Sequence, residues 1–220
     1  MDGLSVLLGL IFLSSVPLFL AYLWILKHHK PLVPVFFILA VLAGLLSLGI
    51  AALIQGLMPP FSGGDVRALM LHIFAGIALT EEGGRLLALA ALFYLRRFVG
   101  SARDTPFTTA QGAAIGLVAG FGFALVENLS YAAAAPQLAL LRAITAAPLH
   151  GACGARVGMA VQVFRAAPGR AVYRFLSAVL IHGMYNLLLI VPNFPAPVPI
   201  ALAFIALGSS LLAIRTGNAA

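Results

Sequence analysis

The stretch LTEEGGRLLALA, residues 79–90, places two glutamates and an arginine in the middle of a long apolar segment. A charged side chain at the centre of a membrane-spanning helix costs about 2.5–3.5 kcal/mol, so ionisable groups at that depth mark functional sites by default. Glu81 and Arg85 have the i,i+4 spacing of an ion pair, and one glutamate would suffice to lock the helix. The second carboxylate, Glu82, therefore favours a functional site.

The rest of the chain has the composition of a membrane protein. Of its 220 residues, 62% are hydrophobic and 9% are charged, and the mean hydropathy is +1.08. Runs of about 20 apolar residues, the length that crosses a bilayer, recur along nearly the whole chain. We therefore predict an all-α, polytopic membrane protein with one transmembrane domain, residues 1–220, and about seven membrane-spanning helices. The predicted spans are 4–26, 31–57, 67–95, 108–134, 138–164, 171–191 and 196–214.

The positions of the basic residues predict the orientation. The net charge of +7 raises the question of a nucleic-acid partner, but most basic residues fall on one side of the seven-span arrangement. That side carries Lys27, Lys30, Arg96, Arg97, Arg103, Arg165, Arg170, Arg174 and Arg215. Only Arg67 and Arg142 fall on the other side. By the positive-inside rule, the amino terminus lies outside and the carboxyl terminus in the cytoplasm, and no nucleic-acid partner is expected.

The fourth span adds a third intramembrane carboxylate. Gly112, Gly116 and Gly120 lie near one helical stripe together with Glu127. Small residues allow a neighbouring helix to approach closely, so we expect Glu127 to point into a helix–helix interface. Asn128 beside it is a donor that needs a partner.

The fifth and sixth spans contribute imidazoles. His150 shares a face with Gly154 and Gly158, while the single cysteine, Cys153, cannot form an intrachain disulfide and is best interpreted as a small buried thiol. Arg156 has two possible roles, pairing with a carboxylate or extending toward the cytoplasm. In the sixth span, His182 and Asn186 form an i,i+4 pair, with Tyr185 between them. Antiparallel packing places these residues at similar depths in the membrane. We therefore expect four spans to direct polar side chains into one layer of the bilayer.

Several mechanisms of intramembrane proteolysis lack their residues here. The sequence has no HExxH, no aspartate within a span and no GxSG motif. Zincin-type, paired-aspartate and serine mechanisms are therefore not indicated. The polar residues that remain for catalysis are glutamate, histidine and asparagine. Among these, a glutamate carboxylate can act as a general base that activates water.

Four ordered segments carry these residues: EEGGR at 81–85, GFGFALVENLSYA at 120–132, RAITAAPLHGACGARVGMA at 142–160 and HGMYN at 182–186. They resemble the blocks of the PrsW family of intramembrane proteases, a glutamic-type family distantly related to the CAAX prenyl proteases. The first block of that family reads EExxK and the second GFAxxEN. This chain has Arg85 for the usual lysine and Asn186 where members often carry an acidic residue. The CAAX enzymes have the longer EExxxR and a histidine in place of Glu127.

The resemblance implies proteolysis of a membrane-embedded or juxtamembrane substrate, such as a single-span anti-sigma factor cut from the extracytoplasmic side of a bacterial inner membrane. It assigns the base to Glu81 or Glu82, with Glu81 preferred. Glu127 and His150 would hold the water, and His182 with Asn186 would stabilise the oxyanion. The catalytic candidates are Glu81, Glu82, Glu127, His150 and His182, supported by Arg85, Asn128 and Asn186. No cofactor or metal is expected.

Two alternatives use the same residues. The carboxylates and imidazoles are also a plausible ligand set for a metal-dependent membrane hydrolase. A non-catalytic scaffold or a transporter could use the cluster for assembly or for proton-coupled movement.

Overall fold

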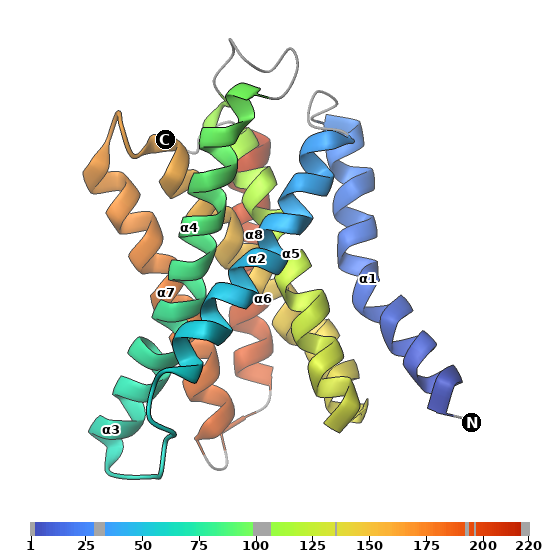
Figure 1. Ribbon diagram of the computed structural model, residues 1–220, viewed down its shortest axis with the longest axis vertical. Coiled ribbons are helices and arrows are strands. Elements are labelled where there is room, and N and C mark those ends of the chain that lie inside the picture. The colour runs from blue at the N-terminus through green and yellow to red at the C-terminus, as the bar shows by residue number, and fades with distance from the viewer. Residues whose placement is uncertain are drawn as a thin grey trace.

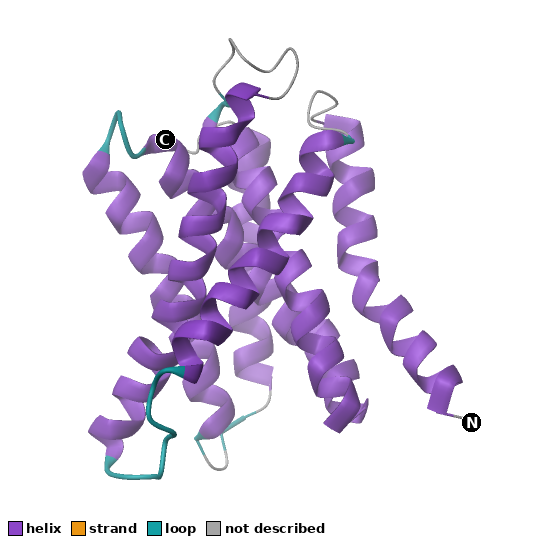
Figure 2. Ribbon diagram, viewed as in Figure 1, coloured by secondary structure: helices purple, strands orange, loops and turns teal. Residues whose placement is uncertain are grey.

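The chain forms a bundle of long helices (Figure 1). The computed structural model describes residues 3–28, 34–98, 107–134, 136–191, 194–195 and 197–216, and Figure 2 shows helices and loops but no strand among them. The long helices are α1 Gly3–His28, α2 Val35–Gly56, α5 Thr109–Ala134, α6 Pro136–Val163, α7 Pro168–Ile190 and α8 Pro197–Thr216, with a further continuous helical stretch over 66–95. The predicted all-α architecture is confirmed, and each described helical stretch lies within a few residues of a predicted span.

The stretch over 66–95 contains a change of helix type. It consists of α3 Val66–Leu71, the π-helix η2 His72–Ala78 and α4 Leu79–Leu95, and it ends in the 3₁₀ turn η3 Arg96–Phe98. A π-helical turn is often found at a functional site, and this one immediately precedes the two glutamates. Phe74 of η2 lies against α7, where a Cβ added to Gly183 would be 2.3 Å from the ring. This close contact brings α7, and with it His182, to the start of α4.

α5 and α6 pack against each other through their glycines. A Cβ added at Gly116 would lie 2.1 Å from the carbonyl oxygen of Gly154, and one added at Gly120 would lie 2.0 Å from that of His150. No side chain fits at such separations, so the two backbones touch, as the glycine stripe predicted. The register of these contacts is antiparallel, and it places His150 opposite the part of α5 that leads to Glu127.

This packing makes the glycines sensitive to a single methyl group. We expect Gly116→Ala to lower the free energy of unfolding by about 1–3 kcal/mol, the usual cost of overpacking, because backbone atoms cannot move aside as a side chain can. Thermal unfolding in detergent micelles measures the change. Gly49→Ala in α2 is the matched control, because a Cβ there meets nothing within 4 Å. Equal melting of the two variants would contradict the close packing.

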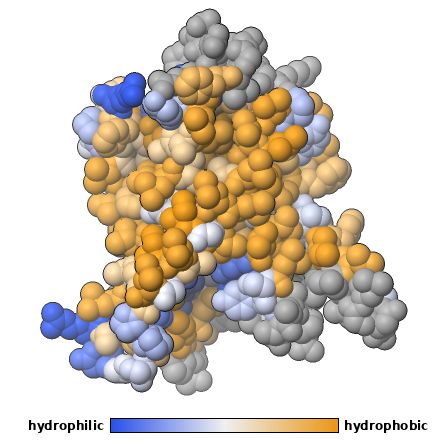
Figure 3. Space-filling view, viewed as in Figure 1, coloured by the Kyte–Doolittle hydropathy of each residue, from blue (hydrophilic) through white to orange (hydrophobic). Residues whose placement is uncertain are grey.

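The outer surface of the bundle is apolar. Figure 3 shows hydrophobic atoms over the middle of the visible face, with hydrophilic atoms toward its two ends. Within the described residues, five helices, α1, α2, α5, α7 and α8, contain stretches long and apolar enough to cross a membrane. The other two long stretches, 66–95 and α6, carry charged and polar residues of the interior. The chain is thus a multi-pass membrane protein.

Arg156 pairs with no carboxylate among the described residues, which was one of the two roles considered for it. Its guanidinium donates to the hydroxyls of Ser210 at 2.6 Å and Ser209 at 2.7 Å, and to the carbonyl oxygens of Ala206 and Ala152, each at 3.2 Å. Three of these four acceptors are on α8. Arg156 therefore links α6 to α8.

Candidate active site

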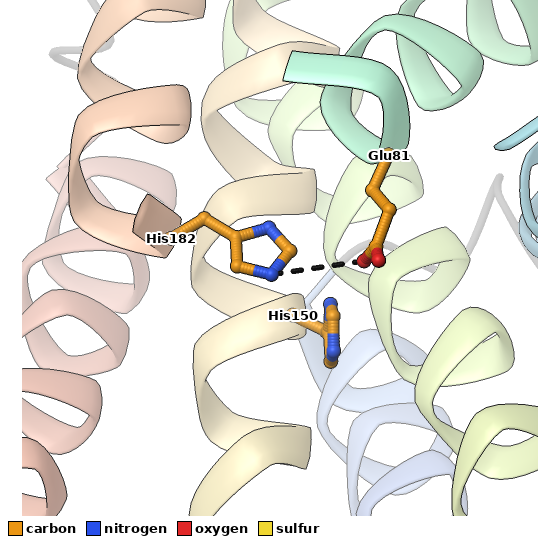
Figure 4. Close-up of side chains that lie close together, drawn as sticks. All are labelled: Glu81, His150 and His182. Carbon is orange, nitrogen blue, oxygen red and sulfur yellow. Dashed lines mark ion pairs between the residues drawn. The ribbon is translucent and has the colours of Figure 1, made fainter. Parts of the chain in front are cut away.

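Three buried side chains from three helices converge in the interior of the bundle. Figure 4 shows Glu81 of α4, His150 of α6 and His182 of α7 directed toward a common point. One potential ligand atom from each lies within 4.8 Å of the others. The two imidazole rings are nearly perpendicular, with centroids 5.0 Å apart. The predicted convergence of polar groups at one depth is therefore present for these three.

Glu82 is fully engaged by two neighbours. Its Oε2 pairs with the guanidinium of Arg85, and both side chains have no exposed surface. Its Oε1 accepts from Nδ1 of His182 at 2.8 Å. The expected pair between Glu81 and Arg85 was therefore wrong. Both the i,i+3 and the i,i+4 spacings place residues on one helix face, and here the i,i+3 partner forms the ion pair.

Glu81 is less engaged than its neighbour. Its Oε1 accepts from Nε2 of Gln55 in α2 at 3.4 Å, and the same amide donates to the Thr80 hydroxyl at 3.0 Å. Its Oε2 is buried without a hydrogen-bond partner among the described residues, and it lies 3.6 Å from Nε2 of His182. A buried, unsatisfied carboxylate oxygen is costly and is a feature of sites that bind something else.

Glu127 contacts two residues of α6. Its Oε2 lies 2.8 Å from Nε2 of His150, and its Oε1 lies 2.6 Å from Nη2 of Arg142. Nδ1 of His150 is 3.4 Å from Nη2 of Arg85. Because a guanidinium can only donate, this contact makes Nδ1 the acceptor and leaves the proton on Nε2, which faces Glu127. Glu127 and Arg85 therefore fix the orientation and the tautomer of the His150 imidazole.

Arg142 is a site residue that the sequence analysis missed. The seven-span arrangement places it toward the outer side of the membrane and gives it no role in the site, yet its side chain is only 14% exposed and pairs with Glu127. Its guanidinium lies 4.0 Å from the centroid of the Tyr131 ring, on α5 beside Glu127. The glycine register of α5 and α6 contained the signal, because continuing the antiparallel pairing from Gly120 and His150 brings Glu127 opposite Arg142.

Phe123 forms an aromatic wall of the site. The Arg85 guanidinium lies 4.8 Å from its ring centroid, and the ring centroids of Phe123 and His150 are also 4.8 Å apart. A cation over an aromatic face is stabilised further when it is shielded from water, as Arg85 is here. Phe123 thus holds the two groups in place without adding a titratable atom.

The two predicted asparagines lie in different environments. Asn128 has no exposed surface, and neither atom of its amide has a hydrogen-bond partner among the described residues. Asn186 is half-buried, and no hydrogen bond joins it to the cluster in the described part of the chain. The structure therefore brings Glu81, Glu82, Arg85, Glu127, His150 and His182 together, but not Asn186.

A further histidine and the single cysteine lie outside the cluster. His72 stacks on Phe61 with ring centroids 4.6 Å apart. Cys153 is fully buried, and its Sγ lies 3.5 Å from the carbonyl oxygen of Ala178. This environment is that of a small buried thiol, as expected.

The chemistry of the cluster also fits a divalent metal ion. Two imidazoles and one carboxylate are the protein ligands of several catalytic zinc sites. Each imidazole also has a carboxylate on a ring nitrogen, Glu82 on His182 and Glu127 on His150, as metal-binding histidines commonly do. Glu81, His150 and His182 are thus the residues that would hold such an ion.

Comparison with known proteins identifies the family. Neither curated proteins nor solved structures give a significant match to the chain. A family model described as "PrsW family intramembrane metalloprotease" matches residues 29–210, which is most of the chain and includes every residue of the cluster. The scaffold and transporter alternatives are accordingly not favoured. The chain belongs to the PrsW family and is an intramembrane protease.

Proposed function

We propose that this protease activates its attacking water with the carboxylate of Glu81. The observation that supports this role is the unequal engagement of two adjacent glutamates. Both oxygens of Glu82 are bonded, to Arg85 and to His182, whereas Oε2 of Glu81 is buried with no hydrogen bond among the described residues. A general base must have an accessible lone pair within hydrogen-bond reach of the water.

In this mechanism, a water bonded to Oε2 of Glu81 attacks the scissile carbonyl carbon. Glu81 accepts the proton as the new C–O bond forms, and it then donates that proton to the leaving amine as the C–N bond breaks. His182 is oriented by its bond from Nδ1 to Glu82, and its Nε2, 3.6 Å from Glu81, is directed toward the reacting atoms. When that nitrogen carries a proton, it stabilises the oxyanion.

The other charged residues act as positioning residues in this proposal. Arg85 pairs with Glu82, and Glu82 in turn orients His182. Glu127, held by Arg142, orients His150 beside the water. Asn128 has an amide available to bind the substrate main chain, because neither of its polar atoms is bonded within the described residues. Preorganised groups of this kind cost no reorganisation during the reaction.

We propose that the site receives its substrate from the extracytoplasmic side. The nine-to-two split of basic residues supports an outside amino terminus and a cytoplasmic carboxyl terminus. Glu127 and Arg142, the more exposed members of the site at 16% and 14%, lie toward the extracytoplasmic end in that orientation. A suitable substrate is a single-span protein of a bacterial inner membrane, such as an anti-sigma factor.

The orientation has a direct test. A green fluorescent protein fused after Ala220 should be fluorescent in bacterial cells, because this reporter folds in the cytoplasm but not after export in unfolded form. Alkaline phosphatase at the same position should be inactive. The opposite pair of results would reverse the orientation and assign the site to the cytoplasmic half of the membrane.

The activity and its substrate can be identified in one experiment. Membrane fractions of cells that carry the wild type or Glu81→Gln are compared by quantitative proteomics. We expect at least one single-span protein to be shortened or depleted with the wild type only. If both strains have the same membrane proteome although both proteins are present in the membrane, Glu81 is not the catalytic base.

A metal-dependent mechanism is the second candidate. It is favoured by the grouping of Glu81, His150 and His182 within 4.8 Å and by the description of the family as metalloproteases. A bound divalent ion would supply Lewis-acid activation of water and of the scissile carbonyl. The cation of Arg85, 3.4 Å from Nδ1 of His150, opposes a second positive charge at this point and favours the glutamate mechanism.

Metal analysis separates the two mechanisms. We expect the purified protease to contain less than one equivalent of any transition metal and to retain its activity in 1,10-phenanthroline. Glu81 as a general base needs no ion. The control is the inactive analogue 1,7-phenanthroline, which does not chelate. One equivalent of zinc, with activity that the chelator removes and zinc restores, would make Glu81 a metal ligand.

A further inference from the structure

A cavity lined by none of the catalytic candidates lies between α4, α6 and α7. Its volume is about 670 Å³, within the range of about 300–1,000 Å³ of small-molecule sites. Apolar side chains form most of its lining, among them Leu87, Ala90 and Phe93 of α4 and Val172 and Phe175 of α7. In Figure 1, α4 and α7 diverge toward the end of the bundle at which α6 turns into α7. The lining residues of the cavity come from the parts of α4, α6 and α7 near that end.

The charged groups in the lining of this cavity are two arginines. Arg96 follows the last turn of α4, and Arg165 follows the end of α6. The guanidinium of Arg96 lies 5.0 Å from the centroid of the Phe107 ring. No acidic residue lines the cavity in the described part of the chain. The lining of the cavity is thus mostly apolar and includes two cations.

These charges indicate which molecule fits. In the proposed orientation the arginines face the cytoplasmic leaflet, where anionic phospholipids attract basic groups. A substrate helix is a poor occupant, because its cytoplasmic flank carries lysines and arginines by the same positive-inside rule. A phospholipid has the complementary chemistry, with acyl chains for the groove and a phosphate that a guanidinium can bind through two parallel hydrogen bonds.

We propose that this cavity is a binding site for one anionic phospholipid, with an acyl chain between α4 and α7 and its phosphate between Arg96 and Arg165. This site is separate from the proposed catalytic function. It is connected to that function through the helices, because α4 carries Glu81 and α7 carries His182. A bound lipid would hold these two helices at a fixed separation.

Native mass spectrometry of the full chain, released from detergent micelles with added lipid, tests this site. We expect one dioleoylphosphatidylglycerol to be retained per chain and dioleoylphosphatidylcholine to be retained much less. Each arginine near a membrane surface strengthens anionic-lipid binding by about fivefold, so Arg96→Gln/Arg165→Gln should weaken retention by about 25-fold. Ala90→Phe, which fills the groove without changing charge, should also reduce retention. Arg215→Gln is the control, because Arg215 is exposed at the end of α8 and outside the cavity.

Several results would overturn the proposal. Equal retention of the two lipids would show that the charge of the headgroup is not recognised. Unchanged retention in both the double variant and Ala90→Phe, each with a normal melting temperature, would place the lipid elsewhere. Equal thermal stabilisation by glycerol phosphate alone would indicate an anion site without an acyl chain. A photo-crosslinker at Leu87 that labels polypeptide but not lipid in membranes would assign the groove to a helix.

Discussion

Glu81→Gln should reduce the rate of peptide hydrolysis by about 10²–10⁴-fold, the usual contribution of a general base. The substitution keeps the size of the side chain and its contact with Gln55, but it removes the group that accepts the proton. The free energy of unfolding should change by less than about 1 kcal/mol, because Glu81 has no ion pair with Arg85 to lose. Cleavage of a purified substrate in lipid vesicles gives the rate, and thermal unfolding in micelles gives the stability.

The control for this variant is Gln55→Ala. It removes the one hydrogen bond that Glu81 accepts among the described residues, at 3.4 Å, and keeps the carboxylate. We expect a loss of activity well below that of Glu81→Gln, because a long, weak hydrogen bond positions the base but is not the base. A Glu81→Gln enzyme that cleaves at the wild-type rate would assign the proton transfer to another residue.

Glu82→Gln, unlike Glu81→Gln, should cause a large loss of stability. Arg85 has no exposed surface, and its ion-pair partner among the described residues is Glu82. Removing one partner of a buried pair leaves an uncompensated charge and usually costs about 3–5 kcal/mol. Thermal or detergent-induced unfolding should show this loss. Activity should also fall, because His182 loses the carboxylate that orients its ring.

A double variant distinguishes the two effects of Glu82. Glu82→Gln/Arg85→Met removes both charges and should recover much of the stability, since replacing a buried pair by apolar groups is often neutral. Activity should not recover with it, because the bond from a carboxylate to His182 is still absent. A single Glu82→Gln variant that melts at the wild-type temperature would contradict the buried pair.

The fold was predictable because its signals are local. Apolar runs, prolines and charges indicate the helices to within a few residues. The glycines of α5 indicate that a neighbouring helix packs closely, but they do not identify that neighbour as α6. The change to π geometry over His72–Ala78 was not predicted, because no residue type in that segment distinguishes a π-helix from an α-helix. The segment packs against α7 through Phe74, and this tertiary contact cannot be read from the sequence.

For the site, the sequence identified the residues better than their partners. Glu81, Glu82, Glu127, His150 and His182 were conspicuous as polar groups in apolar spans. Which of two glutamates pairs with Arg85 depends on side-chain rotamers and on the competing bond from His182. Gln55, from a helix with no other polar motif, reaches Glu81 through the packing of α2 on α4. These contacts depend on tertiary packing and could not be predicted from the spacing of residues along the sequence.

The π-helical segment before Glu81 also determines which of the two glutamates has a carboxylate oxygen without a hydrogen bond among the described residues. A π turn accommodates an extra residue, and one residue corresponds to about 100° of rotation about the axis of an α-helix. If the segment became α-helical without losing a residue while α3 stayed in place, each later residue would take the position that its successor now holds. Glu81 would then stand where Glu82 now bonds to His182, and Thr80 would stand where Glu81 now lies. The functional difference between two chemically identical neighbours therefore depends on the phase of the helix.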